Sequence, residues 1–184
     1  DVDRLALICE DGKPFGEDYT LVSIADYLLS RVYNEALQTG KSIEEIAAPY
    51  QMVTSSNLSS SRALRDVTEQ YGGEYCTAAV GEVNVTTKMR EAGALIGGEG
   101  NGGVIYPALH YGRDAMVGVA LFLTNLAYKK MKVSELRASY PEYVIAKNKI
   151  ELSDSALIDR ILEEVKTVYA AEDINTIDGV KISF

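Results

Sequence analysis

The sequence predicts an α/β fold, a three-layer α/β/α sandwich with a mainly parallel mixed sheet, followed by a truncated α+β unit. Short apolar runs that suit buried strands alternate with longer segments of helical periodicity through residues 1–140. This alternation is typical of a parallel sheet covered by helices. The 184 residues are 47% hydrophobic, which is enough for one domain with its own core and part of a second. We expect the α/β/α domain at 1–143 and the start of another unit at 144–184.

The first half of the chain is expected to hold most of the sheet. A buried-type strand at 4–9 leads into a turn marked by Asp11-Gly12, a frequent hairpin dipeptide. The elements that follow are expected in this order: a helix from Asp18 with apolar residues at helical spacing, a possible helical turn at 42–47, a strand at 51–54, a helix at 61–71, a strand at 74–78, a helix at 81–92 and a strand at 94–97.

The second half is expected to be mainly helical. Its elements are a long apolar helix at 114–130, a shorter helix after Val133 that Pro141 ends, an extended linker or strand at 144–152, and an amphipathic helix at 156–169. We expect Ser153-Asp154-Ser155 to cap the last of these helices. A turn at Asp178-Gly179 and one strand finish the chain. We expect this unit to be truncated, because a single strand cannot satisfy its own backbone groups.

Composition excludes several classes of partner. The formal net charge of -9 argues against nucleic acid and acidic membrane surfaces. No apolar run is long enough to span a bilayer and no signal peptide is present, so we expect a cytoplasmic protein. Cys9 and Cys76 stand in strand-like runs and are expected to be reduced. Because Asp1 leads straight into an apolar strand without an initiator Met, we expect a piece cut from a longer protein.

The glycine-rich stretch 97–103 is the most distinctive feature of the sequence. Glycine lets a backbone approach a ligand closely, and Glu99 and Asn101 add hydrogen-bonding side chains. The stretch follows a strand, as does the loop at 55–60, and ligands of α/β folds sit at the carboxyl ends of strands. We expect a binding loop; the alternative is a turn with solvated polar residues. Gly98, Gly100 and Gly103 also match G-x-G-x-x-G, but a β-like run and Pro107 follow instead of a helix, which excludes dinucleotide binding.

Charged residues near the start of the chain suggest a second part of the site. Asp1 and Asp3 are spaced so that their carboxylates can converge on a hard divalent cation. Arg4 beside them can neutralise a phosphate.

Five stretches, in order along the chain, resemble the α-D-phosphohexomutases, the family of phosphoglucomutase and phosphomannomutase. They are 1–7, similar to the latter part of the metal loop Asp-x-Asp-x-Asp-Arg; 57–64, similar to the segment that opens a helix of the third domain; 77–82, similar to the Thr-x-x-Val-Gly turn; 98–103, similar to the sugar-specificity loop; and 110–115, similar to the turn into the following helix.

The resemblance implies an enzyme of four domains around one cleft. A phosphoserine of the first domain donates its phosphate to a hexose phosphate, the bisphosphate intermediate reorients, and its other phosphate returns to the serine, with Mg²⁺ held by the metal loop. This chain resembles the third domain and the start of the fourth. The roles implied for its residues are Mg²⁺ ligation by Asp1 and Asp3, catalysis beside the reacting phosphate by Arg4, and sugar recognition by Glu99, Gly100, Asn101 and Gly102.

Departures from the family pattern point to a fragment that is inactive alone. The phosphoserine loop, Thr-x-Ser-His-Asn-Pro, is absent. The first aspartate of the metal loop would precede Asp1, and the phosphate loop of the fourth domain would follow Phe184. Gly103 stands where many members carry His, and Asn101 where many carry Ser. We expect a glucose or mannose phosphate as substrate of the full-length parent, with glucosamine phosphate also compatible.

Two other function classes remain open. The first is a non-catalytic sugar-phosphate-binding or interaction module. The second, a hydrolase that uses His110 with one of the serines 59–61, is disfavoured because no Gly-x-Ser-x-Gly elbow is present. For Arg113 and Asp114 two interpretations stay open, a pair that only starts a helix and a pair with a functional role. Glu99 has no expected core role, so its replacement by Ala should reduce catalysis and leave thermal stability nearly unchanged.

Overall fold

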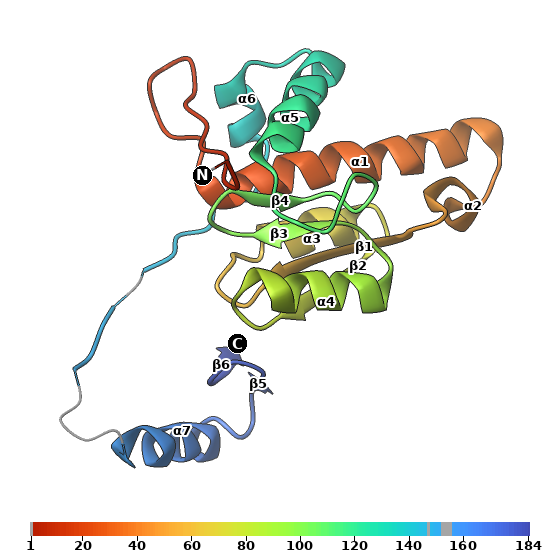
Figure 1. Cartoon of the computed structure of the whole chain (residues 1–184). Coiled ribbons are helices and arrows are strands. Elements are labelled where there is room, and N and C mark those ends of the chain that lie inside the picture. Colours follow the sequence, from red (N-terminus) through yellow and green to blue (C-terminus); the bar gives the residue numbers. More distant parts are fainter. Residues whose placement is uncertain (1, 147, 152–155) are drawn as a thin grey trace. The chain divides into compact units, whose positions relative to one another are not determined.

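The computed structural model describes residues 2–146, 148–151 and 156–184. The chain divides into two compact units, residues 1–144 and 145–184 (Figure 1). Among the described residues, no helix combines the length and apolar character that crossing a membrane requires.

A four-stranded mixed sheet lies at the centre of the first unit. Its strands are β1 (Gln51–Asn57), β2 (Glu74–Ala78), β3 (Ala94–Glu99) and β4 (Gly103–Ile105). They lie in the order β2-β1-β3-β4, with β1 parallel to both of its neighbours and β4 antiparallel to β3. The expectation of a mainly parallel mixed sheet is confirmed. Every residue of β3 and β4 is buried, as a sheet covered on both faces requires.

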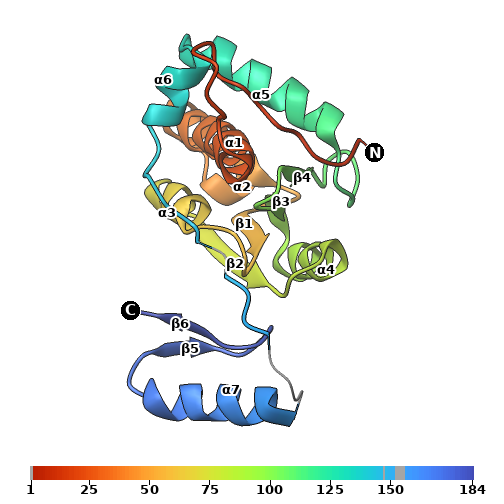
Figure 2. The same ribbon diagram turned by 90° about the vertical axis from the view of Figure 1, so that its left-hand side faces the viewer.

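Helices cover both faces of this sheet. Figure 2 shows α1 (Glu17–Thr39) and α3 (Ala63–Gln70) on one side of the strands and α4 (Glu82–Ala92) on the other. The larger hydrophobic cluster joins α1, α3 and the sheet, and includes Phe122 of α5 (Ala115–Lys129). A smaller cluster fills the space between the sheet and α4, where Val85 and Met89 are fully buried. The three-layer α/β/α architecture is therefore confirmed.

Helix boundaries follow local capping chemistry. Ser42 and Glu45 form a reciprocal capping box at the start of α2 (Ile43–Ala47). The side chain of Asp114 accepts hydrogen bonds from the backbone N–H groups of Met116 and Val117 at the start of α5. The short α6 (Val133–Ala138) ends before Pro141, as expected.

The segment 4–9 is not a buried strand, so that prediction was wrong. Its only β interaction is an isolated bridge between Ile8 and Pro14, and Ile8 is 63% exposed. The backbone N–H of Leu5 instead donates to the carbonyl of Gly102, at an N···O distance of 3.0 Å. Because β4 takes the edge position beside β3, the apolar segment lies against the β3–β4 turn with only alternate side chains covered.

The second unit consists of α7 (Ala156–Val168) and an antiparallel pair, β5 (Asp173–Asn175) and β6 (Lys181–Ser183). The expected terminal strand therefore has a partner, which precedes it in the chain, and the prediction of an unpaired strand was wrong. Ile174 pairs with Ile182 across this hairpin. The described residues of 144–152 form no helix or strand, and the expected cap at 153–155 lies outside the described residues.

Candidate active site

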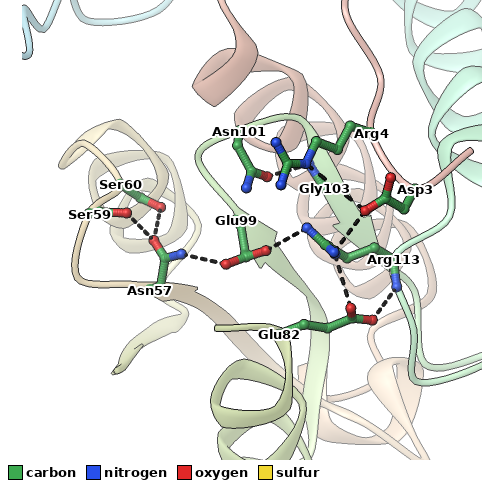
Figure 3. A network of polar contacts seen from close by, with 10 residues as sticks. All are labelled: Asp3, Arg4, Asn57, Ser59, Ser60, Glu82, Glu99, Asn101, Gly103 and Arg113. Atoms are coloured by element: carbon green, nitrogen blue, oxygen red, sulfur yellow. Dashed lines mark hydrogen bonds and ion pairs between the residues drawn. The ribbon is translucent and has the colours of Figure 1, made fainter. Parts of the chain in front are cut away.

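Two polar side chains meet where neighbouring parallel strands end. Asn57 is the last residue of β1 and Glu99 the last residue of β3. Asn57 Nδ2 donates to Glu99 Oε1 at 2.8 Å, and the two residues are 2% and 5% exposed. Residues 55–57, expected in a loop, are the end of β1. The segment 55–60 and the glycine-rich stretch thus come together at the carboxyl edge of the sheet (Figure 3). This edge is where α/β folds bind ligands.

Glu99 is part of the strand and is buried, contrary to the expected position in an exposed loop. β3 continues through Gly97 and Gly98 to Glu99, because β4 pairs with these three residues as a hairpin. Arg113 Nη1 donates to Glu99 Oε2 at 2.9 Å. A buried carboxylate is costly unless it is paired, so Glu99 has a role in stability that the sequence did not predict.

Arg113 is the centre of an ion-pair network. It lies between β4 and α5, with its backbone in an isolated bridge to Ile105. Its three guanidinium nitrogens each contact a different carboxylate: Nη1 contacts Glu99 at 2.9 Å, Nη2 contacts Asp3 at 2.7 Å and Nε contacts Glu82 at 3.1 Å (Figure 3). The backbone N–H of Arg113 also donates to Glu82 Oε1 at 2.9 Å. The side chain is 16% exposed.

Two of the residues expected to bind metal or phosphate, Asp3 and Arg4, lie on the segment beside this network. Asp3 reaches Arg113, whereas the Arg4 side chain is 57% exposed and its Nε lies 4.0 Å from Asp3 Oδ2. Asp1 lies outside the described residues. Within residues 2–146, 148–151 and 156–184, no three His, Cys, Asp or Glu side chains form a group that could hold a metal ion. The carboxylate of Asp3 already pairs with a guanidinium, so the described residues do not by themselves provide a Mg²⁺ site.

The expected sugar-binding glycines form a tightly packed turn. A Cβ at Gly100 would lie 2.6 Å from Asp18 Oδ1. At Gly102, where φ is +87°, a Cβ would lie 2.5 Å from the carbonyl oxygen of Leu5. Asn101 Oδ1 accepts from the backbone N–H of Gly103 at 3.2 Å, which closes the turn. Glycine is needed here because other chain segments approach the backbone closely.

The serine-rich loop supports Asn57 from the other side. Ser59 Oγ and Ser60 Oγ each donate to Asn57 Oδ1 at 3.0 Å, which leaves Asn57 Nδ2 directed at Glu99. Ser61 donates to Asp18 through its hydroxyl and its backbone N–H. Burial raises the pKa of Asp18, and the hydrogen bonds from Ser61 partly oppose that shift.

His110 has a different role from the one a hydrolase needs. Its Nε2 pairs with Asp114 Oδ2 at 3.0 Å, and this hydrogen bond lowers the pKa of Asp114. The serines at 59–61 bond to Asn57 and Asp18 instead. Ser59 and Ser60 therefore support the loop through Asn57. The expected capping role was wrong for these two, because α3 has Arg62 at its N-cap without a side-chain cap hydrogen bond. Only Ser61 contacts the start of the helix, where its Oγ accepts from the backbone N–H of Ala63 at 3.2 Å.

Three residues of this network were not predicted as site residues from the sequence. Asn57, Glu82 and Arg113 all stand in stretches that carried the family resemblance, but they were assigned to helix starts and turns. A usable signal was present for Asn57, because it stands in the segment 55–60, which the sequence predicts at the carboxyl end of a strand. No local signal links Arg113 to carboxylates that lie 14, 31 and 110 residues away in the sequence.

Comparison with known proteins identifies similar chains. The family model described as "Phosphoglucomutase/phosphomannomutase, alpha/beta/alpha domain III" matches residues 17–143. A protein of Methanopyrus kandleri named probable phosphoglucosamine mutase is 30% identical over 183 residues, covering 99% of this chain and 37% of the relative. A phosphoglucomutase/phosphomannomutase of Thermococcus kodakarensis is 30% identical over 186 residues, covering 100% of this chain and 37% of the relative.

A solved structure has the same fold. The phosphoglucomutase/phosphomannomutase family protein of Burkholderia thailandensis superposes with a TM-score of 0.72 at 24% sequence identity, covering 100% of this chain and 36% of that protein. The chain therefore spans about 37% of the length of these two curated relatives.

Proposed function

This chain belongs to the phosphoglucomutase/phosphomannomutase family and carries its α/β/α domain III, and from that premise we propose that it is part of an enzyme that interconverts hexose 1-phosphate and hexose 6-phosphate. The reaction proceeds through a phosphoserine outside this chain and a hexose bisphosphate intermediate. Relatives named for glucosamine phosphate and for glucose or mannose phosphate are equally similar, so we propose a hexose or hexosamine phosphate as substrate.

The observation that carries the proposal is the fixed carboxylate of Glu99. Each of its oxygens receives one protein hydrogen bond, from Asn57 or from Arg113. A carboxylate has about four lone-pair sites, so Glu99 can still accept hydrogen bonds from sugar hydroxyls. Because both protein partners hold it in one orientation, the carboxylate can select the hydroxyl pattern of a bound sugar.

The other expected site residues have supporting roles in this proposal. Gly100 and Gly102 let the β3–β4 turn pack closely, and Asn101 offers a carboxamide to the sugar from that turn. The exposed guanidinium of Arg4 is suited to pair with the reacting phosphate. Phosphoryl transfer depends mainly on positioning and charge neutralisation, and these residues supply both.

We propose Mg²⁺ as a cofactor of the full-length enzyme only. The resemblance implies Asp1 and Asp3 as ligands, but the described residues do not complete a site. Arg113 also holds the Asp3 carboxylate. We therefore assign no step of the reaction to a metal held by this chain alone.

The organisation of the whole protein is also part of the proposal. Residues 144–184 are the linker and the beginning of domain IV, and the remaining domains of the enzyme are the partners of this chain. The activity takes place in the cytoplasm. Nucleic acid and membranes are not partners, in keeping with the net charge of -9.

The test compares the full-length protein that contains this chain with residues 1–184 alone. Each is assayed with glucose, mannose and glucosamine 1-phosphate, with the matching bisphosphate as activator. We expect turnover by the full-length protein and none by residues 1–184. Turnover by residues 1–184 would overturn the assignment of the phosphoserine to another domain. Binding of sugar phosphates by the full-length protein without turnover would establish the non-catalytic binding module instead.

A further inference from the structure

We infer that Arg113 is a positioning residue for sugar recognition: it fixes the orientation of the Glu99 carboxylate, and Asp3 and Glu82 in turn fix Arg113. The inference deepens the proposed function and rests on it. Neither the family resemblance nor the sequence pattern assigned Arg113 to the site, and the inference follows from the ion-pair geometry alone.

The guanidinium is held in one position by three separate contacts. Nη2 contacts Asp3 at 2.7 Å and Nε contacts Glu82 at 3.1 Å, which leaves Nη1 directed at Glu99. The planar fork of arginine keeps its N–H directions fixed relative to one another. Because Nη2 and Nε are held by carboxylates, Nη1 cannot turn away from Glu99.

The backbone around Arg113 is built to accept this side chain. Glu82 is the first residue of α4, and its other oxygen accepts the backbone N–H of Arg113. Asp114 N donates to the carbonyl of Val104 in β4 at 2.9 Å. A Cβ at Gly103 would lie 2.5 Å from Arg113 Cδ, so the glycine leaves the space through which the arginine reaches Glu99 (Figure 3).

The positive charge of Arg113 also compensates the negative charge of its three carboxylate partners. Asp3, Glu82 and Glu99 bring three carboxylates to one place, and the Arg113 guanidinium contacts all of them. An uncompensated group of carboxylates would repel an anionic sugar phosphate. A lysine would keep the positive charge, but its ammonium is a compact point charge that cannot reproduce the three-way fork. Arg113→Lys therefore separates positioning from charge.

The experiment uses the full-length enzyme and measures kcat and KM for the preferred hexose 1-phosphate. We expect Arg113→Lys to raise KM and to lower kcat/KM by about 10- to 100-fold, since small misplacements at an active site have effects of this size. A merely structural role would reduce the amount of folded enzyme, which lowers the apparent kcat and leaves KM unchanged. The matched control is Arg90→Lys, because Arg90 stacks on Tyr111 of the same loop, 3.7 Å from the ring centroid.

A double-variant cycle tests whether Arg113 acts through Glu99. We expect Glu99→Gln combined with Arg113→Lys to have the same kcat/KM as Glu99→Gln alone, because contacts that act as a unit are not additive. Independent, multiplying losses would overturn the inference. If Arg113→Lys melts below the assay temperature, Glu82→Gln serves in its place and should raise KM in the same direction by a smaller factor.

The outcomes also separate this inference from the proposed function. If the wild-type enzyme turns over normally and the folded Arg113 and Glu82 variants have an unchanged KM, the positioning role of Arg113 is overturned and the proposed function still holds. A wild-type protein that neither turns over nor binds the sugar phosphates overturns both, because Glu99 would then have no sugar to recognise.

Discussion

Replacement of Glu99 by Ala should destabilise the protein as well as impair catalysis. The substitution removes the acceptor of two hydrogen bonds, from Asn57 at 2.8 Å and from Arg113 at 2.9 Å, at a residue that is 5% exposed. Breaking a buried ion pair by removing one partner costs about 3–5 kcal/mol. Arg113 keeps its contacts with Asp3 and Glu82, so we expect the lower end, about 3 kcal/mol.

Thermal unfolding of residues 1–184, followed by circular dichroism, measures this effect. A loss of about 3 kcal/mol corresponds to a melting temperature about 6–12 °C lower for a chain of this size. The matched control is Glu91→Ala on α4, since Glu91 is 62% exposed and its pair with Lys88 spans 3.8 Å. The control should shift the melting temperature by less than about 2 °C, because exposed ion pairs contribute little.

The same measurement can contradict the predicted loss of stability. If Glu99→Ala melts within about 2 °C of the wild type, Glu99 does not depend on its two partners and the network in Figure 3 does not hold it. The original expectation of an unchanged stability would then be correct. Loss of catalytic efficiency in the full-length enzyme is expected in either case, by roughly ten- to a hundredfold.

Three further predictions concern other parts of the chain. Calorimetric titration of residues 1–184 should detect no Mg²⁺ binding tighter than about millimolar, since Arg113 holds Asp3; a micromolar site would contradict this. Burial raises the pKa of Asp18 in the folded protein above its value in the unfolded chain, so the protonated carboxyl stabilises the fold at low pH and this stabilisation is lost as pH rises through the folded pKa. The melting temperature of Asp18→Asn minus that of the wild type should therefore increase from about pH 4 to pH 7. A difference that stays constant over this range would contradict the prediction. In hydrogen exchange, backbone amides of the β5–β6 hairpin should exchange faster than those of β1, because an isolated pair of strands is marginally stable. Equal protection of the two in a monomer would contradict this and show that the hairpin is part of a larger sheet.

The sequence predicts the central layers of the fold well. Residues 51–54, 74–78 and 94–97 are short apolar or β-prone runs, and they lie in the parallel strands β1, β2 and β3. β1 and β3 extend beyond the expected ends, to Asn57 and Glu99. The segment 4–9 misled the prediction because its apolar composition matches a buried strand. Whether this segment is buried depends on which segment pairs with the edge of β3. That position is taken by β4, which lies about 100 residues later in the chain.

Prediction of the site from the sequence was also limited to local patterns, because contacts between distant residues form only in the folded chain. Glu99 was identified because a carboxylate among glycines at a strand end is a local pattern. The partners of Glu99 were not, since Asn57 and Arg113 meet it only after β1, β3 and β4 are assembled. Long-range ion pairs such as Arg113 with Asp3 have no signature in the spacing of residues, so a local reading of Arg113 as a helix-start residue was the natural one.

The most direct test of sugar recognition by Glu99 compares substrates that lack one hydroxyl. The full-length enzyme and its Glu99→Gln variant are assayed with the preferred hexose 1-phosphate and with its monodeoxy analogues. A site built to hydrogen-bond a hydroxyl rejects the analogue that lacks it, so the wild type should discriminate against at least one analogue by about tenfold or more. We expect Glu99→Gln to lose most of that discrimination. An unchanged discrimination ratio in the variant, for every analogue, would contradict the claim that Glu99 reads the sugar.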